Sequence, residues 1–186
     1  MGEAMKKVCI IVGSLRKDSF NFQLAKKVEE LISSKAEVFF LDYKNIPLMN
    51  QDIEFPTPQS ISEVRKQVQQ ADAIWICSPE YNCTIPGVLK NLLDWLSRPL
   101  KANDFSSGTA VMGKKVTICG AGGKFATAGM RKNLKELLEF IKMQVIYSEG
   151  TGIAVNPDAF ATNKVVFTQE QLDSLSKQAE QFLSEI

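Results

Sequence analysis

The feature that most constrains the fold is a repeated alternation of short apolar runs and helical patterns. Continuous apolar runs indicate buried strands at residues 8–12, 38–41, 73–77, 116–119 and 145–147. Apolar residues recur at helical spacing over residues 22–34, 61–68, 87–96, 128–141 and 168–183. Buried strands that alternate with amphipathic helices predict an α/β fold of three layers, α/β/α, in which helices cover both faces of a parallel sheet.

Five strands in this alternation predict a doubly wound, flavodoxin-like sheet with strand order 2-1-3-4-5. The chain of 186 residues is long enough for one such domain, which we assign to residues 5–186. Ligands of such sheets bind beyond the carboxyl ends of the strands, where the strand order reverses. This rule selects three connections, at residues 13–21, 78–84 and 120–127.

Charge and hydropathy exclude several classes of partner. The 22 basic and 21 acidic residues give a net charge of +1, so no overall field attracts nucleic acid or an anionic membrane. No apolar run approaches the roughly 20 residues of a membrane-spanning helix, and the first residues contain no signal-peptide core. We therefore expect a cytoplasmic protein that binds neither nucleic acid nor a membrane.

The chain has four cysteines, Cys9, Cys77, Cys83 and Cys119, and no histidine. No two cysteines form a Cys-x-x-Cys pair, so we expect no metal site. We interpret the cysteines as small buried residues in a reducing compartment. Because the commonest general base is missing, an enzyme with this sequence must use another residue or a cofactor.

The first connection carries the residue types of an anion site. Ser14, Ser19 and Asn21 supply side-chain donors, and Arg16 supplies positive charge in a fork that suits phosphate. Gly13 permits a sharp turn, and the N–H groups that begin the next helix favour an anion. These residues predict a monophosphate site. The alternative is a surface turn in which Ser19 or Asn21 only caps the helix.

The second and third connections predict a place for a flat ring. The second, Pro79-Glu80-Tyr81-Asn82, is stiffened by Pro79 and by Pro86, and Tyr81 offers an aromatic face. Its backbone amides offer polar contacts for the edge of a ring. The third, Gly120-Ala121-Gly122-Gly123, is interpreted as backbone that approaches such an edge, with plain flexibility as the alternative.

Together these motifs resemble the NADPH-dependent FMN reductase family, which includes chromate and quinone reductases and some azoreductases. The resemblance rests on Gly13-Ser14-Leu15-Arg16 with Ser19-Phe20-Asn21, on Pro79-Glu80-Tyr81-Asn82, and on Pro86-Gly87 with Leu89-Lys90-Asn91 and Asp94-Trp95. It implies a flavodoxin-like fold, tightly bound FMN, and a homodimer or homotetramer.

The resemblance also implies where FMN would bind. The residues around the phosphate and ribityl end would be Ser14, Arg16, Ser19, Asn21 and Phe22. The residues at the isoalloxazine ring would be Pro79, Glu80, Tyr81 and Asn82, mainly through backbone groups, with Gly120, Ala121 and Gly122 closing over its other part. The third connection departs from the family, because many relatives have a serine-containing stretch where this chain is rich in glycine.

The activity implied by the resemblance is oxidoreduction. NADPH or NADH would reduce the flavin, and a quinone, azo dye, free flavin or oxidised metal would then accept the electrons in a ping-pong cycle. One alternative is a flavodoxin-type electron carrier, against which the net charge of +1 argues. Another is a non-catalytic flavin-binding or sensor module. The physiological acceptor, the choice between NADPH and NADH, and the choice between dimer and tetramer stay open.

Overall fold

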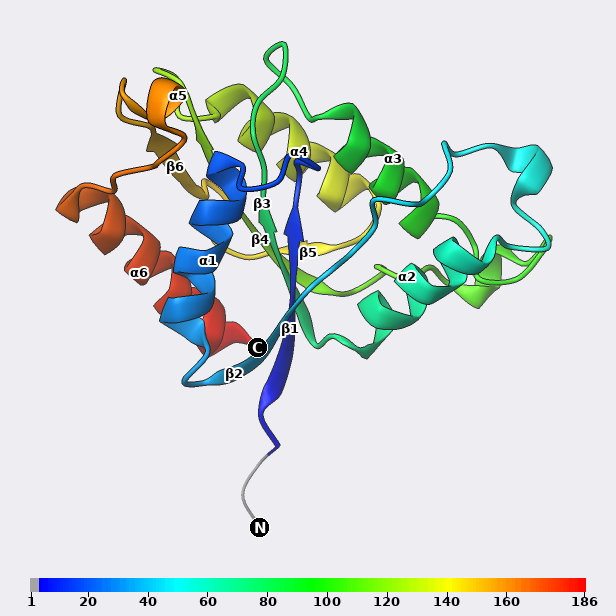
Figure 1. Ribbon diagram of the computed structural model, residues 1–186. Coiled ribbons are helices and arrows are strands. Elements are labelled where there is room, and N and C mark those ends of the chain that lie inside the picture. Colours follow the sequence, from blue (N-terminus) through cyan, green and yellow to red (C-terminus); the bar gives the residue numbers. More distant parts are fainter. Residues whose placement is uncertain (1–3) are drawn as a thin grey trace.

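The computed structural model describes residues 4–186, and Figure 1 shows a central sheet with helices on both sides. The strands are β1 (Lys6–Val12), β2 (Ala36–Phe40), β3 (Ala73–Cys77), β4 (Lys115–Gly122), β5 (Gln144–Val145) and β6 (Thr151–Ala154). The helices are α1 (Phe20–Ile32), α2 (Gln59–Gln70), α3 (Gly87–Leu96), α4 (Ala128–Phe140), α5 (Ala159–Thr162) and α6 (Gln169–Glu185), with 3-10 turns η1 (Gln51–Ile53) and η2 (Phe105–Ser107). The strand order β2-β1-β3-β4-β5, with parallel pairing, confirms the predicted doubly wound arrangement.

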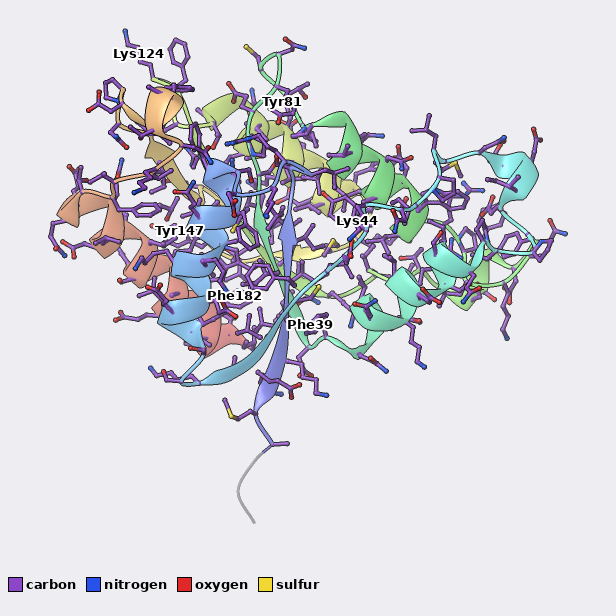
Figure 2. All side chains as sticks on the ribbon, viewed as in Figure 1. Phe39, Lys44, Tyr81, Lys124, Tyr147 and Phe182 are labelled. Atoms are coloured by element: carbon purple, nitrogen blue, oxygen red, sulfur yellow. The ribbon has the colours of Figure 1, made fainter. Side chains whose placement is uncertain are left out.

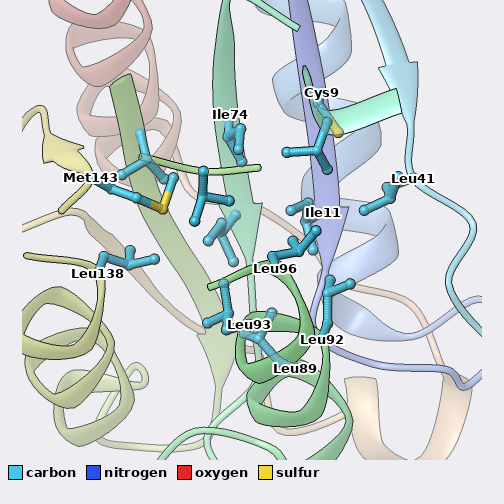
Figure 3. Close-up of a cluster of buried hydrophobic side chains, with 14 of the residues drawn as sticks. Cys9, Ile11, Leu41, Ile74, Leu89, Leu92, Leu93, Leu96, Leu138 and Met143 are labelled. Atoms are coloured by element: carbon cyan, nitrogen blue, oxygen red, sulfur yellow. The ribbon is translucent and has the colours of Figure 1, made fainter. Parts of the chain in front are cut away.

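Each face of the sheet carries its own hydrophobic cluster. On one face, α2, α3 and α4 cover the sheet, and Figure 3 shows Leu89 and Leu93 of α3 within this cluster. On the other face lie α1 and α6. Here the rings of Trp75 from β3 and Phe182 from α6 pack edge to face, with centroids 5.1 Å apart. Because every residue of β3 is buried, its sequence is a continuous apolar run.

The C-terminal helix α6 is amphipathic and has a defined start. It begins at a capping box, in which Thr168 and Gln171 bond reciprocally to each other's backbone N–H groups. Within residues 4–186, no helix has both the length and the apolar character needed to cross a membrane. The first three residues, which bear on the expectation of no signal peptide, lie outside the described part of the chain.

The last position in the sheet differs from the single strand predicted at residues 145–147. β5 pairs with the beginning of β4 and β6 pairs with its end, so two short strands fill one position. Between them the chain turns at Tyr147, whose φ is 55° and whose carbonyl accepts from the N–H of Gly150 at 2.9 Å. The prediction of one strand was wrong because β6, with the sequence Thr151-Gly152-Ile153-Ala154, is not a continuous apolar run.

β4 continues through Gly120, Ala121 and Gly122, which the sequence analysis placed in a loop. These residues pair with β6. Gly120 has no room for a side chain, since a Cβ there would lie 2.3 Å from Oγ1 of Thr127 and 2.4 Å from the carbonyl oxygen of Ser78. The run is therefore closely packed strand backbone, and both the loop and its flexible alternative were wrong here.

Candidate functional site

A cavity of about 400 Å³ opens at the carboxyl ends of β1, β3 and β4. Tyr81 and Lys124 mark this end of the sheet in Figure 2. The volume is that of a small-molecule site. All three predicted connections contribute to its walls, which consist of Ser14, Arg16, Ser19, Phe20, Asn21, Pro79, Glu80, Tyr81, Ala121, Gly122, Gly123, Phe160 and Asn163. The predicted site residues outside these walls are Phe22, Asn82 and Gly120.

The phosphate loop, which we define as residues 13–19, begins in close contact with the second connection. The N–H of Gly13 donates to the carbonyl of Cys77 at 2.8 Å. A Cβ on Gly13 would lie 2.3 Å from Oγ of Ser78, and the φ of Gly13 is outside the left-handed region. Glycine is thus required by close packing and not, as the sequence suggested, by the turn itself.

Ser19 both caps α1 and faces the cavity. Its Oγ accepts from the N–H of Phe22 at 3.1 Å. A capping hydroxyl keeps its own proton to donate, and the first N–H groups of a helix have no acceptor within the helix. The capping role and the anion-binding role are therefore compatible in this residue.

Arg16 supplies the positive charge of the phosphate loop. Its guanidinium lies over the ring of Phe20, 5.2 Å from the centroid, and Nη1 donates to Oδ1 of Asn163 at 2.6 Å. Its backbone N–H donates to Oγ of Ser14 at 3.3 Å. Because a guanidinium has five N–H donors, several are left for an oxyanion in the cavity.

Asn21 and Phe22 have structural partners. The Asn21 amide exchanges two hydrogen bonds with the backbone of Ala121, donating from Nδ2 at 2.9 Å and accepting at Oδ1 at 2.8 Å. This pair ties α1 to β4. Phe22 packs against Phe40, with ring centroids 5.7 Å apart, beside a second hollow of about 370 Å³. Cofactor contacts of Asn21 and Phe22 stay predictions.

The second connection ends in a tight hairpin turn. Tyr81 and Thr84 exchange backbone hydrogen bonds at 3.1 and 3.0 Å, and the two residues between them, Asn82 and Cys83, have φ values of 51° and 61°. The turn projects from the carboxyl end of the sheet and leaves the ring of Tyr81 half exposed at the cavity (Figure 2). Tyr81 therefore offers an apolar face to a planar ligand.

The start of α4 anchors this second connection. Oε2 of Glu80 accepts from the backbone N–H of Met130 at 2.7 Å, in the first turn of α4. The amide of Asn133 donates to Oγ1 of Thr84 at 3.1 Å. A carboxylate at a helix N-terminus is favoured by the helix dipole. Glu80 thus has a role in holding the wall of the cavity.

The β4–α4 connection, residues 123–127, is held by its backbone. Ala126 and Thr127 both have left-handed conformations, with φ values of 47° and 59°. This region is strained for a β-branched residue. Thr127 is buried, and its Oγ1 has no hydrogen-bond partner among the residues that the structure describes. Glycine backbone packs closely against this connection, because a Cβ at Gly122 would lie 3.0 Å from Cγ2 of Thr127 and one at Gly152 would lie 2.4 Å from the carbonyl oxygen of Ala126.

Two cavity residues come from a segment that the sequence analysis did not single out. Phe160 lies on α5, and Asn163 directly follows it. The rings of Phe160 and Phe20 pack edge to face, with centroids 5.4 Å apart. Asparagine suits the left-handed φ of 57° at Asn163. That signal marks the end of a helix and does not by itself indicate a binding site.

The thiols of Cys77 and Cys119 lie 3.3 Å apart on neighbouring strands, and Cys77 precedes the second connection. Burial, with a further contribution from Cys119, raises the pKa of the Cys77 thiol well above its ordinary value. Burial likewise raises the pKa of Cys9 to about 12. Neutral buried thiols are poor nucleophiles. Cys83 differs from the expectation, because it is exposed in the hairpin turn.

The groups that line the cavity suit both parts of FMN. Arg16, Ser19 and the start of α1 supply positive charge and hydrogen-bond donors for a phosphate. Tyr81 and the backbone of Ala121 and Gly122, which line the same cavity, suit a flat ring with a polar edge. The walls thus offer groups suited to binding and orienting a cofactor.

Comparison with known proteins finds FMN reductases and quinone reductases among the relatives. A family model described as NADPH-dependent FMN reductase matches residues 6–154. The NAD(P)H-dependent FMN reductase of Pseudomonas aeruginosa is 34% identical over 156 residues, which are 83% of this chain and 80% of that protein. A quinone reductase of Escherichia coli K12 is 32% identical over 184 residues, 95% of this chain and 93% of that protein. A 2-hydroxy-1,4-benzoquinone reductase of Burkholderia sp is 45% identical over 93 residues, so this match spans only 51% of that protein.

Solved structures agree on the fold. FerB, a flavoenzyme NAD(P)H:(acceptor) oxidoreductase from Paracoccus denitrificans, superposes with a TM-score of 0.83 at 27% identity, covering 97% of this chain and 96% of that chain. A flavodoxin from the domain Archaea shares the fold with a TM-score of 0.61 at 14% identity, covering 96% of this chain and 97% of that chain. The residues matched by the family model include all three connections but end before α5.

Proposed function

The chain belongs to the NADPH-dependent FMN reductase family, and we propose that it is an NAD(P)H-dependent quinone reductase that binds FMN tightly in the cavity. NADPH or NADH is the proposed electron donor. A quinone is the favoured acceptor because relatives are named as quinone reductases. Azo compounds, free flavin and metal oxyanions such as chromate are further acceptors that suit the same chemistry.

The observation that carries the proposal is one cavity lined by two unlike sets of groups. One set is the Arg16 guanidinium and the capped start of α1, which suit a phosphate dianion. The other set is the exposed ring of Tyr81 and the backbone of the second connection. A ligand that joins a monophosphate to a flat ring matches both sets.

Bound FMN would supply hydride transfer at its N5 position in both halves of a ping-pong cycle. The chain's own residues bind and orient the cofactor and its substrates. Arg16 and the N–H groups of α1 compensate the phosphate charge, and the anchored second connection keeps one wall rigid through Glu80 and α4. The exposed rings of Tyr81 and Phe160 line the cavity and give a planar substrate apolar contacts. None of these contacts requires a side-chain acid or base.

A flavin spectrum recorded under anaerobic conditions tests the proposal. The purified protein should be yellow, lose its flavin absorbance when NADPH or NADH is added, and regain it when a quinone follows. Flavin that neither reductant bleaches would favour a flavodoxin-type carrier. A colourless protein that takes up no added FMN would favour a non-catalytic module and contradict the proposal.

We propose that the protein acts as a homodimer or homotetramer in the cytoplasm. Phe105 and Phe140 expose 80% and 84% of their surface beside a hollow of about 380 Å³ that Met112 also lines. Clustered exposed apolar side chains are typical of surfaces that contact another protein. Sedimentation equilibrium would measure the oligomeric state, and a monomer at all concentrations would contradict the assembly.

A further inference from the structure

We infer that Asn163 is a positioning residue that holds Arg16 for the phosphate of the cofactor. The inference rests on the proposed function, because it takes the FMN phosphate as the anion in the cavity. Asn163 belongs to what we call the latch segment, residues 156–166, which contains α5. This segment lies beyond residues 6–154, which the family model matches. The latch segment thus adds a wall to a site whose other parts lie within the matched region.

Asn163 uses three of its polar groups to contact the phosphate loop and α1. Oδ1 accepts from Nη1 of Arg16 at 2.6 Å, and Nδ2 donates to the carbonyl of Asp18 at 3.2 Å. The backbone carbonyl of Asn163 accepts from Nε2 of Gln23 at 2.8 Å. A short bond from a charged guanidinium is stronger than a neutral one. One residue therefore connects the cation of the loop, the backbone of the loop and the first helix.

Gln23 holds the latch segment in register with the phosphate loop. Its Nε2 also donates to the carbonyl of Asp18 at 3.1 Å, and its Oε1 accepts from the N–H of Val165 at 2.9 Å. The latch segment also closes on itself, because the N–H of Val166 donates to Oδ1 of Asn156 at 2.9 Å. Gln23 thus holds the backbone of the latch segment at Asn163 and at Val165.

Aromatic packing supports the same geometry. Phe20 of α1 contacts both other groups: its ring packs edge to face with that of Phe160, with centroids 5.4 Å apart, and the guanidinium of Arg16 lies 5.2 Å from its centroid. The guanidinium is therefore held by a ring and by the Asn163 amide. An arginine side chain that is already ordered loses less rotamer freedom when it binds an anion.

The chemical identity of Asn163 suits this role in two ways. A neutral amide orients the guanidinium without cancelling its charge, whereas a carboxylate would compete with the phosphate. The backbone φ of 57° at Asn163 is one that asparagine adopts more readily than most residues. Since only one of the five guanidinium N–H groups goes to Asn163, the others stay available for the phosphate.

The test compares the dissociation constants of FMN and riboflavin, which lacks the phosphate, by fluorescence titration of the flavin-free full chain. Asn163→Gly keeps the left-handed backbone accessible and removes the amide. We expect FMN binding to weaken about tenfold, the effect of one charge-assisted hydrogen bond. Riboflavin binding should be unchanged. Asn103→Gly is the matched control, because Asn103 has the same φ of 57° in an exposed turn that does not line the cavity.

Two further variants separate positioning from a merely structural role. Asn163→Asp should weaken FMN binding more than Asn163→Gly, because the carboxylate neutralises Arg16. In an Arg16→Ala background, Asn163→Gly should cause no further loss. Equal weakening of FMN and riboflavin, or unchanged FMN affinity, would overturn the inference. A wild-type protein with no preference for FMN over riboflavin would instead refute the proposed function, and the inference with it.

Discussion

The phosphate loop and the β4–α4 connection border the same cavity but are held in different ways. The phosphate loop is largely exposed and is held by side chains, through the Ser19 cap and the bond from Arg16 to Asn163. The β4–α4 connection is held by backbone packing, with no room at Gly120 before it and left-handed residues within it. Substitutions in the phosphate loop should therefore mainly change ligand binding, and substitutions at the close backbone contacts around the β4–α4 connection should change stability.

The largest expected effect on stability is at Gly120 in β4, just before the β4–α4 connection. Gly120→Ala would place a Cβ 2.4 Å from the backbone oxygen of Ser78, so either β4 or the second connection must shift. We expect the free energy of unfolding to fall by about 3 kcal/mol, as for overpacked cores. Urea unfolding, monitored by circular dichroism, measures this free energy.

Gly123→Ala is the control for that substitution. A Cβ at Gly123 meets no atom within 4 Å, and its φ lies outside the left-handed region. Its unfolding free energy should stay within about 0.5 kcal/mol of wild type. If Gly120→Ala were as stable as Gly123→Ala, close packing at Gly120 would not be what stabilises this side of the cavity.

A smaller effect separates the two roles of Ser19. Ser19→Ala removes the cap of α1 and should lower stability by about 1 kcal/mol. Ser19→Asp keeps a capping oxygen but places a negative charge beside the proposed phosphate. It should retain more stability than Ser19→Ala while binding FMN less tightly, as measured by urea unfolding and FMN titration. Wild-type FMN affinity in Ser19→Asp would show that Ser19 is only a cap.

The same contrast explains what could be predicted from the sequence. Strand order follows from continuous apolar runs, and the phosphate loop from serine and arginine side chains directly after the first strand. The end of β4 could not be predicted, because Gly120, Ala121 and Gly122 have low strand propensity and their close packing involves distant residues.

The latch segment could not be predicted from the sequence, for a related reason. α5 spans only four residues, too few for a periodic pattern. Asn163 lies 147 positions from Arg16, so their contact depends on the tertiary fold. Candidate site residues within a local motif could be predicted from the sequence. Candidate site residues brought together from distant segments could be identified only in the structure.

The central claim is that the phosphate loop holds the phosphate of FMN. The most direct measurement compares FMN and riboflavin dissociation constants for wild type and Arg16→Ala. The control is Lys17→Ala, which removes a neighbouring cation that does not line the cavity. Loss of the charged contacts should weaken FMN binding about 100-fold in Arg16→Ala and leave riboflavin binding within about twofold. Lys17→Ala should have a much smaller effect. Unchanged FMN affinity in Arg16→Ala would contradict the account.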